Sequence, residues 1–304
     1  MSDTTNEEKM DLAPIETPFK RIWADFCQNK IALAALIVLL IIVCIALFAP
    51  WIAPTNPYDL ASVSILDGKL PPGSESLSGV TYVLGTDGAG RGLLSSIFYG
   101  LRISLGVGVM SALVALVFGA IMGLAAAYYG GRVDTIIMRI VDIQLSFPAI
   151  LVALILLAAL GKGVDKIIIA LVIVQWAYYA RTVRASALVE RSKEYVEAAT
   201  CLALSDRRIL LRHLLPNCLP PLIVIGTVQT AHAISLEATL SFLGVGLPIT
   251  EPSLGLLISN GFEYMMSGKY WISFFPGIAL LVTIVSINLV GDQLRDVLNP
   301  RLQK

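Results

Sequence analysis

The stretch "SKEYVEAATCLALSDRRILLRHLLPN", Ser192 to Asn217, is a hydrophilic segment inside an otherwise apolar chain. Together with the residues that lead into it from Arg181, it carries seven of the 22 Lys and Arg residues. In a membrane protein, loops rich in Lys and Arg remain on the cytoplasmic side. The segment is also patterned to fold, which is typical of a docking surface rather than of a solvated linker.

A first short helix is predicted at the start of this segment. Ser192 can cap it, and Glu194 and Glu197 fall near its positively polarised N-terminal end. Val196, Ala199 and Ala203 follow at helical spacing, and Ala198 adds to an Ala-rich face. A face of alanines inserts poorly into lipid, so it favours close approach to another protein over the alternative, a loop that rests on lipid headgroups.

A second short helix is predicted after a bend near Leu204–Ser205. Ser205–Asp206 is a helix start signal, and Arg208 and Arg212 lie one turn apart beside several leucines. Pro216 is expected to close the segment. The hydrophilic segment therefore predicts two short helices with charged ends and one small, apolar face.

The composition places the whole chain in a membrane. Hydrophobic residues make up 56% of the 304 residues and charged residues only 14%, whereas about a quarter of the residues in a soluble domain are charged. The formal net charge is zero, so nothing favours a nucleic-acid partner. The four cysteines are expected outside external loops, which argues against a structural disulfide, and no pair has the spacing of a metal site.

Six apolar runs approach or exceed the roughly 20 residues that a helix needs to cross a bilayer. The chain is therefore predicted to be an all-α integral membrane protein with six transmembrane helices. The first run is too long for a signal-peptide core, so we interpret it as an anchor. The predicted spans are Ile31–Ile52, Ile103–Tyr128, Ile136–Leu160, Val164–Val183, Leu219–Leu243 and Trp271–Val290.

The distribution of positive charge predicts that both termini are cytoplasmic. With that orientation, sixteen of the 22 Lys and Arg residues lie on the inner side and six on the outer side, as the positive-inside rule requires. Thr17 and Pro18 can start an amphipathic helix along the inner membrane surface, with Phe19, Ile22, Trp23 and Phe26 on one face. The predicted segments before the core are a cytoplasmic tail 1–30, a first span 31–52 and an external loop 53–102. A five-helix core 103–295 follows, and a cytoplasmic tail 296–304 ends the chain. The core includes the loop 184–217, which contains the hydrophilic segment, and the external loop 244–270.

The hydrophilic segment resembles the "EAA" coupling loop of ATP-binding-cassette importer permeases. That loop has Glu-Ala-Ala, a glycine a few residues later, and a basic stretch that ends in Leu-Pro; Ala203 stands where the family usually has glycine. The resemblance implies that an ATPase partner is contacted through Glu194, Glu197, Ala198, Ala199, Ala203, Arg208, Arg212, Leu215 and Pro216.

Further motifs extend the resemblance over nearly the whole chain. They are similar to those of the dipeptide, oligopeptide and nickel branch of these permeases, and closest to the second, "C-type" permease of peptide importers. The motifs are "LGTDGAGRG" at 84–92, "YGLRISLGVG" at 99–108, "RIVDIQLSFPAI" at 139–150, "LEATLSFLGVG" at 236–246 and "GDQLRDVLNPRL" at 291–302.

This resemblance implies a permease subunit of an ATP-driven, binding-protein-dependent importer in the bacterial cytoplasmic (inner) membrane, carrying di- or oligopeptides. The implied partners are a second permease that forms a heterodimer with this chain, two ATPase subunits, an external solute-binding protein and membrane lipid. The same class also includes importers for nickel and other small solutes, which remain an alternative.

The fifth span has one face that differs from the others. At 100° per residue its small and polar residues fall within a stripe about 100° wide, and polar residues at membrane depth usually face the bundle interior or a water-filled cavity. We therefore expect the stripe to line the translocation pathway or to contact a partner permease; packing between small residues is the alternative. The stripe consists of Gly226, Gln229, Thr230, Ala233 and Glu237. His232 lies off it, and we expect it to pack.

The chain is not expected to be an enzyme. It has no Gly-x-x-x-x-Gly-Lys-Ser/Thr loop, so any ATP is expected to be bound by partner subunits, with no cofactor or metal held by this chain. A gradient-driven secondary transporter is the alternative transporter class, but it predicts inverted repeats and ionisable groups at the midplane. A membrane enzyme would require clustered His, Asp or Glu at the lipid boundary.

Overall fold

The structure is a computed structural model that describes residues 18–59, 63–76, 79–248 and 250–298. Within these ranges the regular structure is helical apart from one small hairpin, in which β1 (Ser74–Glu75) pairs with β2 (Thr81–Tyr82). Five described helices are long and apolar enough to cross a membrane, and a sixth span results when one bent pair is counted as a single span. The predicted all-α membrane fold is confirmed.

Two helices form the N-terminal part. α1 (Pro18–Gln28) is followed directly by α2 (Lys30–Ile52), whose N-cap Asn29 accepts hydrogen bonds from the backbone N–H groups of Ile31 and Ala32. The predicted helix in the N-terminal tail is thus present, while its predicted cap Thr17 lies outside the described residues. Phe26 is buried in a cluster with α2 and the last helix of the chain, so α1 packs against the bundle as well as presenting an exposed Trp23.

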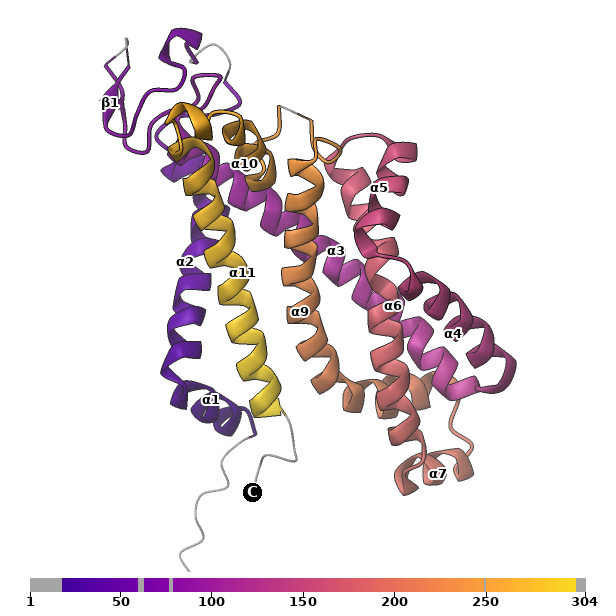
Figure 1. Cartoon of the computed structure of the whole chain (residues 1–304). Coiled ribbons are helices and arrows are strands. Elements are labelled where there is room, and N and C mark those ends of the chain that lie inside the picture. The colour runs from indigo at the N-terminus through magenta and orange to yellow at the C-terminus, as the bar shows by residue number, and fades with distance from the viewer. Residues whose placement is uncertain (1–17, 60–62, 77–78, 249, 299–304) are drawn as a thin grey trace, which may run out of the picture.

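α3 (Leu93–Tyr129) is 37 residues long and begins ten residues before the predicted second span. Its first turns contain serines that lower the hydropathy, yet these side chains are buried. Ser95 accepts hydrogen bonds from the backbone and the hydroxyl of Thr55, at 3.1 and 3.0 Å, so its polarity is compatible with a buried helix start. At about 1.5 Å per residue, α3 is longer than a bilayer is thick, and it crosses obliquely behind the other helices (Figure 1).

The third predicted span is broken in the middle. α4 (Gly131–Ser146) and α5 (Ala149–Leu160) meet at a bend of 94°. Pro148 stands at the break, where its ring prevents a continuous helix and disfavours helical geometry at Phe147. The bend is too sharp for a simple proline kink, so α4 and α5 are two separate helices.

α6 (Val164–Arg191) packs closely along α3 and runs eight residues beyond the predicted end of the fourth span. The close approach depends on two glycines of α3: a Cβ atom on Gly119 or Gly123 would lie 2.5 Å from a carbonyl oxygen of α6. Small residues four positions apart are typical of such close helix packing in membranes. The helix extends because its charged residues find partners: Arg184 pairs with Asp134, and Arg181 pairs at 2.5 Å with Asp142.

The described chain continues through two further long helices and a short one between them. α9 (Leu215–Phe242) and α11 (Trp271–Leu298) lie side by side, and α10 (Leu254–Phe262) packs against both, followed by the turn η3 (Met265–Ser267). In Figure 1 the β-hairpin (β1 and β2) and α10 lie at the upper end of the bundle. The lower end contains α1, the C-terminal end of α11, and α7. The N-terminal helix, the C-terminal end and the hydrophilic segment therefore share one end of the molecule.

The motif "LGTDGAGRG" builds the segment at the opposite end. Asp87 and Arg91 form a buried ion pair with 2.7 Å between Oδ2 and Nε. Gly90 has a positive φ of 86°, and a Cβ atom there would lie 2.1 Å from the carbonyl oxygen of Ser64. Thr86 donates a hydrogen bond to the carbonyl of Asp67 in the turn η1 (Ile65–Asp67). The motif residues thus hold this segment together internally.

Candidate functional site

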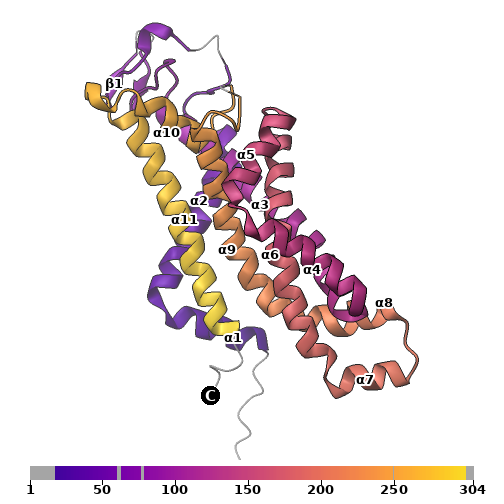
Figure 2. The same cartoon turned by 45° about the vertical axis from the view of Figure 1, so that its right-hand side comes forward.

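The hydrophilic segment forms a helical hairpin at the lower end of the bundle, as predicted. α7 (Glu194–Cys201) is followed by a turn and by α8 (Asp206–Arg208); Figure 2 shows α7 at the bottom of the molecule and α8 beside the lower end of α4. α7 buries Val196 and Ala199 in a cluster with α6 and the start of α9. The hairpin is therefore packed onto the spans rather than hanging as a free loop.

The turn between the two short helices is made on Ala203. This residue has φ +53°, in the left-handed region that glycine adopts without cost. The turn typical of the family is therefore formed here without the usual glycine, at a backbone cost of about 1–2 kcal/mol for an alanine. Alanine in place of glycine therefore keeps the fold of the turn, but the backbone at Ala203 is strained.

Two predicted caps differ from the structure. The N-cap of α7 is Lys193, whereas Ser192 donates to the carbonyl of Val189 at the end of α6. α6 extends as far as Arg191, which leaves Ser192 too close to its end to start a new helix. Ser205 is the N-cap of α8 as predicted, but its side chain makes no capping hydrogen bond.

The second short helix does not end at Pro216, contrary to the prediction. Asp206 to Phe242 form one continuous helical run of 37 residues, in which α8 passes through the π-helical turn η2 (Ile209–Leu214) into α9. Pro216 cannot donate the backbone hydrogen bond of a regular α-helix, and the π-helical turn η2 ends just before it. The hairpin and the fifth span are consequently mechanically continuous.

The charged residues of the hairpin remain largely exposed. Tyr128 on α3 donates to Asp206 at 2.8 Å and ties the hairpin to the bundle. The residues implied in ATPase contact fall into two groups: Ala199 is buried and Leu215 half-buried, while Ala203 and Pro216 are exposed at the turn and at the start of α9. Six residues of the hairpin region are exposed and together are named the docking face: Glu194, Glu197, Ala198, Leu202, Arg208 and Arg212.

Leu202 was not singled out from the sequence. Its side chain is 74% exposed at the tip of the hairpin, beside exposed charged residues. The only signal in the sequence is that it stands between the end of the Ala-rich helix and the turn residue Ala203. An exposed leucine at the tip of a charged hairpin suits insertion into a groove of another protein.

Three of the five residues in the predicted pathway stripe of α9 are buried within the chain, as the packing alternative predicts. Gln229 is only 5% exposed, and Ala233 and Glu237 are fully buried inside the chain, so these three side chains line no open surface. Gln175 of α6 donates to the carbonyl of Gln229, which faces α6. Gly226 and Thr230 are half-buried, and their assignment to the pathway stays a prediction.

Glu237 is satisfied by serines rather than by a basic residue. Its carboxylate accepts hydrogen bonds from Ser104 of α3 at 2.8 Å and from Ser241 of α9 at 2.7 Å. It also interacts with Ser253, the N-cap of α10. The residue therefore joins three helices, which accounts for a carboxyl group on the packed face of a span.

The exposed polar residues of α9 lie on a different stripe. His232, Ser235 and Thr239 are exposed and recur at helical spacing, with the Thr239 hydroxyl bonded to the carbonyl of Ser235 within the helix. His232, which we expected to pack, presents its ring away from the core of the chain. Such residues at membrane depth face a partner or a water-filled space rather than lipid.

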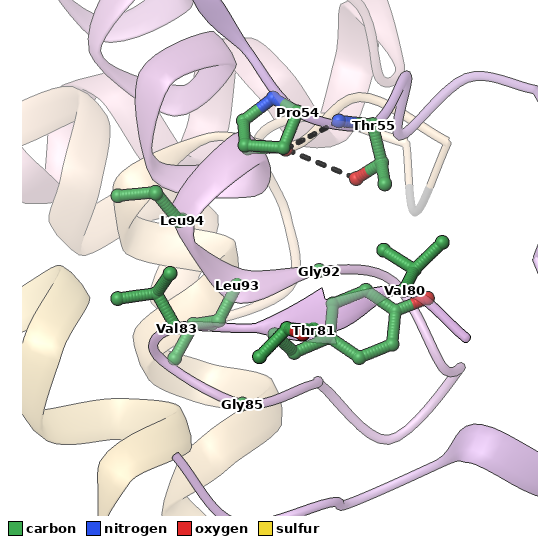
Figure 3. A pocket seen from close by; sticks show the side chains of 11 residues that line it. Pro54, Thr55, Val80, Thr81, Val83, Gly85, Gly92, Leu93 and Leu94 are labelled. Carbon is green, nitrogen blue, oxygen red and sulfur yellow. Dashed lines mark hydrogen bonds between the residues drawn. The ribbon is translucent and has the colours of Figure 1, made fainter. Parts of the chain in front are cut away.

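Two cavities lie near the upper end of the molecule. One of about 300 Å³ is lined by residues of α3 and α6 and by Tyr58, which donates to Glu251 at 2.8 Å. Burial raises the pKa of Tyr58, and the bond to Glu251 raises it further, so its hydroxyl keeps its proton. The other, between Thr55, Tyr82 and the start of α3 (Figure 3), measures about 20 Å³. It has room for about one water molecule and is too small for a peptide.

Comparisons with known proteins agree with this architecture. Residues 115–304, more than half of the chain, match the family described as binding-protein-dependent transport system inner membrane component. Residues 17–72 match the N-terminal TM domain of oligopeptide transport permease C. The two matches together extend over both the N-terminal helices and the core that carries the hairpin.

Individual relatives match over nearly their whole length. The dipeptide transport system permease protein DppC of Escherichia coli K12 is 40% identical over 305 residues, covering 100% of each chain. The di/tripeptide transport system permease protein DppC of Pseudomonas aeruginosa is 38% identical over 288 residues, covering 94% of this chain and 93% of the relative.

A solved structure supports the same fold. A chain of the methionine ABC transporter MetNI, in an inward facing conformation, superposes with a TM-score of 0.54 at 21% sequence identity and covers 67% of this chain and 96% of that one. At this identity the likeness concerns the fold. The chain therefore belongs to the binding-protein-dependent transport system inner membrane components, as a multi-pass, C-type permease subunit of the ATP-binding-cassette importer class.

Proposed function

We propose that this chain is one of two different permease subunits of an ATP-driven importer for di- or oligopeptides. The cargo is inferred from relatives of full length whose names state dipeptide or di/tripeptide transport. The partners we propose are a second permease, two ATPase subunits and an external solute-binding protein. Both termini and the hairpin would face the cytoplasm, in keeping with the positive charge at that end.

The observation that carries the coupling role is the docking face on a hairpin continuous with a span. Glu194, Glu197, Arg208 and Arg212 are exposed with no ion pair among the described residues. Such charges suit complementary groups on another protein, which steer association and fix register. The 37-residue helical run from Asp206 to Phe242 connects the hairpin directly to a membrane span, so that a displacement of the hairpin is transmitted to that span.

The proposed cycle follows from this continuity. ATP binding closes the two ATPase subunits, and their grooves displace the hairpins of both permeases. The displacement rocks α9 and its neighbours from an inward-open to an outward-open arrangement, and hydrolysis resets them. ATP is bound and hydrolysed by the partner subunits; this chain contributes no nucleotide site, cofactor or metal.

We propose that the route through the membrane is lined by the exposed stripe His232, Ser235 and Thr239 rather than by the buried one. Its polarity at membrane depth favours water or a partner permease. Ser235→Cys in a cysteine-free chain is expected to react with a small, water-soluble thiol reagent, and Ala233→Cys on the buried face is the matched control. Equal protection of both cysteines in the assembled complex would contradict this lining.

The function is tested by reconstituting the complete complex into proteoliposomes. Uptake of a labelled dipeptide is expected to require ATP and the binding protein, and to persist when ion gradients are collapsed. Uptake that survives without ATP but stops with a protonophore would make the chain a gradient-driven transporter. ATP-dependent uptake of nickel with no peptide uptake would support the ATP-driven importer class but show that the cargo is nickel rather than a peptide.

A further inference from the structure

Three segments of the lower end meet at one phenol hydroxyl. Tyr195 of α7 donates a hydrogen bond to Glu190 Oε2 at 2.8 Å, and it accepts one from Asn217 Nδ2 at 3.0 Å. Glu190 lies at the end of α6, and Asn217 lies in the first turn of α9. The hydroxyl thus uses its donor and one acceptor position to join α6, α7 and α9. We name Glu190, Tyr195 and Asn217 the clasp.

The outer members of the clasp are themselves held in place. Glu190 Oε1 accepts a hydrogen bond from Lys193 Nζ at 2.7 Å, and Asn217 Nδ2 donates to the carbonyl of His213 at 2.7 Å. An amide NH₂ group has two hydrogens, so Asn217 can make both of its bonds at once. The ring of Tyr195 also lies 6.5 Å from the ring of His213. The position of Tyr195 is therefore fixed from both sides.

The clasp matters because α7 has little else to hold it. A helix of eight residues is not stable on its own, and α7 buries only Val196 and Ala199, both small or medium side chains. Apolar contact of this kind is non-directional. The hydrogen bonds of Tyr195 give α7 a directional connection to α6 and α9.

Asn217 lies within a deformable part of the long helix. The π-helical turn η2 precedes it, and Pro220 and Pro221, which lack backbone N–H groups, follow it. His232 lies fifteen residues further along, about 22 Å at the rise of an α-helix. A displacement of Asn217 therefore acts where the helix can bend, directly below the exposed polar stripe.

We propose that Tyr195 is a positioning residue that transmits displacement of α7 to both α6 and α9, and so couples ATPase closure to movement of the spans. The proposal rests on the proposed function, in which α7 is the segment that an ATPase subunit moves. Glu190 and Asn217 are the two points at which the movement enters the spans.

The hydroxyl is suited to this role throughout the physiological pH range. Burial, and then the hydrogen bond to Glu190, raises the pKa of Tyr195 to about 12. The phenol therefore keeps the proton that it donates to Glu190.

The experiment uses the complete importer complex in proteoliposomes, with peptide uptake, ATP hydrolysis and recovery of the complex measured together. Tyr195→Phe removes both bonds and keeps the ring, while Asn217→Ala removes only the bond to α9. Tyr129→Phe is the matched control, because the Tyr129 hydroxyl makes no hydrogen bond within the described residues and its side chain is exposed.

The expected result is a loss of coupling without a loss of assembly. Peptide taken up per ATP hydrolysed should fall about tenfold in Tyr195→Phe and about threefold in Asn217→Ala, with recovery of the complex within twofold of wild type. The double variant should be no worse than Tyr195→Phe alone, because residues that share one interaction are non-additive. Tyr129→Phe should match the wild type.

Two results would overturn the proposal. One is an unchanged ratio of uptake to hydrolysis in both single variants. The other is a parallel fall of uptake, hydrolysis and complex recovery in both, which would make the clasp a folding contact only. Failure of the proposed function is visible separately, in the wild-type complex, as uptake that does not depend on ATP.

Discussion

The motif segment 84–92, at the upper end of the molecule in Figure 1, and the docking face are both rich in motif residues, yet they use charge in opposite ways. In segment 84–92, Asp87 and Arg91 are buried and paired with each other, and glycines let the chain fold back on its own backbone. In the docking face, Glu194, Glu197, Arg208 and Arg212 are exposed, with no ion pair among the described residues.

The difference shows that the charged residues of a motif can serve one of two purposes, folding or contact with a partner. A buried, mutually satisfied pair contributes to folding, because removing one partner leaves the other charge uncompensated. An exposed set of charges contributes little to folding and is free to meet a partner. The comparison therefore predicts that changes in the first region lower stability and that changes in the second lower transport.

The largest expected effect is on stability, from Asp87→Ala. Asp87 accepts hydrogen bonds from the N–H groups of Ala89 and Arg91 in addition to its ion pair. Its loss is expected to cost about 3–5 kcal/mol, the usual consequence of an unpaired buried charge. The measurement is thermal unfolding of the purified chain in detergent. Asp165→Ala, which breaks an exposed pair with Lys166, is the control and should leave the unfolding midpoint unchanged. Equal midpoints for both variants would contradict the stabilising role of the buried pair.

Glu197→Lys is expected to reduce transport without unfolding the chain. Glu197 is exposed in the first turn of α7, so the substitution leaves the core intact, but it presents the wrong charge to a groove that fits a carboxylate. ATP-dependent uptake should fall about 100-fold, the equivalent of about 2.7 kcal/mol. Glu75→Lys, in the β-hairpin at the opposite end of the molecule, is the matched control and should transport normally. Wild-type uptake in Glu197→Lys would remove the coupling assignment.

Reversal of both arginines of the docking face is expected to weaken association with the ATPase subunits. Arg208→Glu with Arg212→Glu should lower the affinity about tenfold, the equivalent of about 1.4 kcal/mol. The effect should shrink at high salt, which screens exposed charges. Co-purification at low and high ionic strength measures both. Unchanged co-purification at low salt would indicate that the two arginines face only lipid headgroups.

The smallest expected effect is a gain, from Ala203→Gly. Alanine at φ +53° is strained, and glycine relieves the strain, so the variant should be more stable by up to about 1 kcal/mol. Transport should remain unchanged because the docking face is preserved. Ala203→Val is the counterpart and should be less stable, since a β-branched residue tolerates positive φ least. A lower unfolding midpoint in Ala203→Gly would contradict the strained turn.

The sequence predicted those parts of the fold that depend on local patterns. The apolar runs gave the six spans, and the hydrophilic segment gave a two-helix hairpin. The start of α3 was placed ten residues too late, because its serines lower hydropathy while Thr55, some 40 residues away, satisfies Ser95. A pairing between distant segments leaves no local signal.

The predicted pathway stripe shows the same limit of local sequence patterns more clearly. Helical periodicity correctly put Gln229, Ala233 and Glu237 on one face of α9, but periodicity does not say what covers that face. Ser104 on α3 and Gln175 on α6 cover it, and neither has a sequence pattern that points to α9. In a bundle, small and polar residues serve both packing and lining, so only the tertiary structure separates the two.

The most direct test of the central claim is site-specific photocrosslinking in native membranes, with a photoreactive amino acid at Leu202. This side chain is 74% exposed at the tip of the hairpin, and Val83, 62% exposed at the opposite end, is the matched position. The account predicts that Leu202 captures an ATP-binding-cassette ATPase subunit and that Val83 does not. Capture of lipid alone at Leu202, in membranes where the complex is intact and transports, would contradict it.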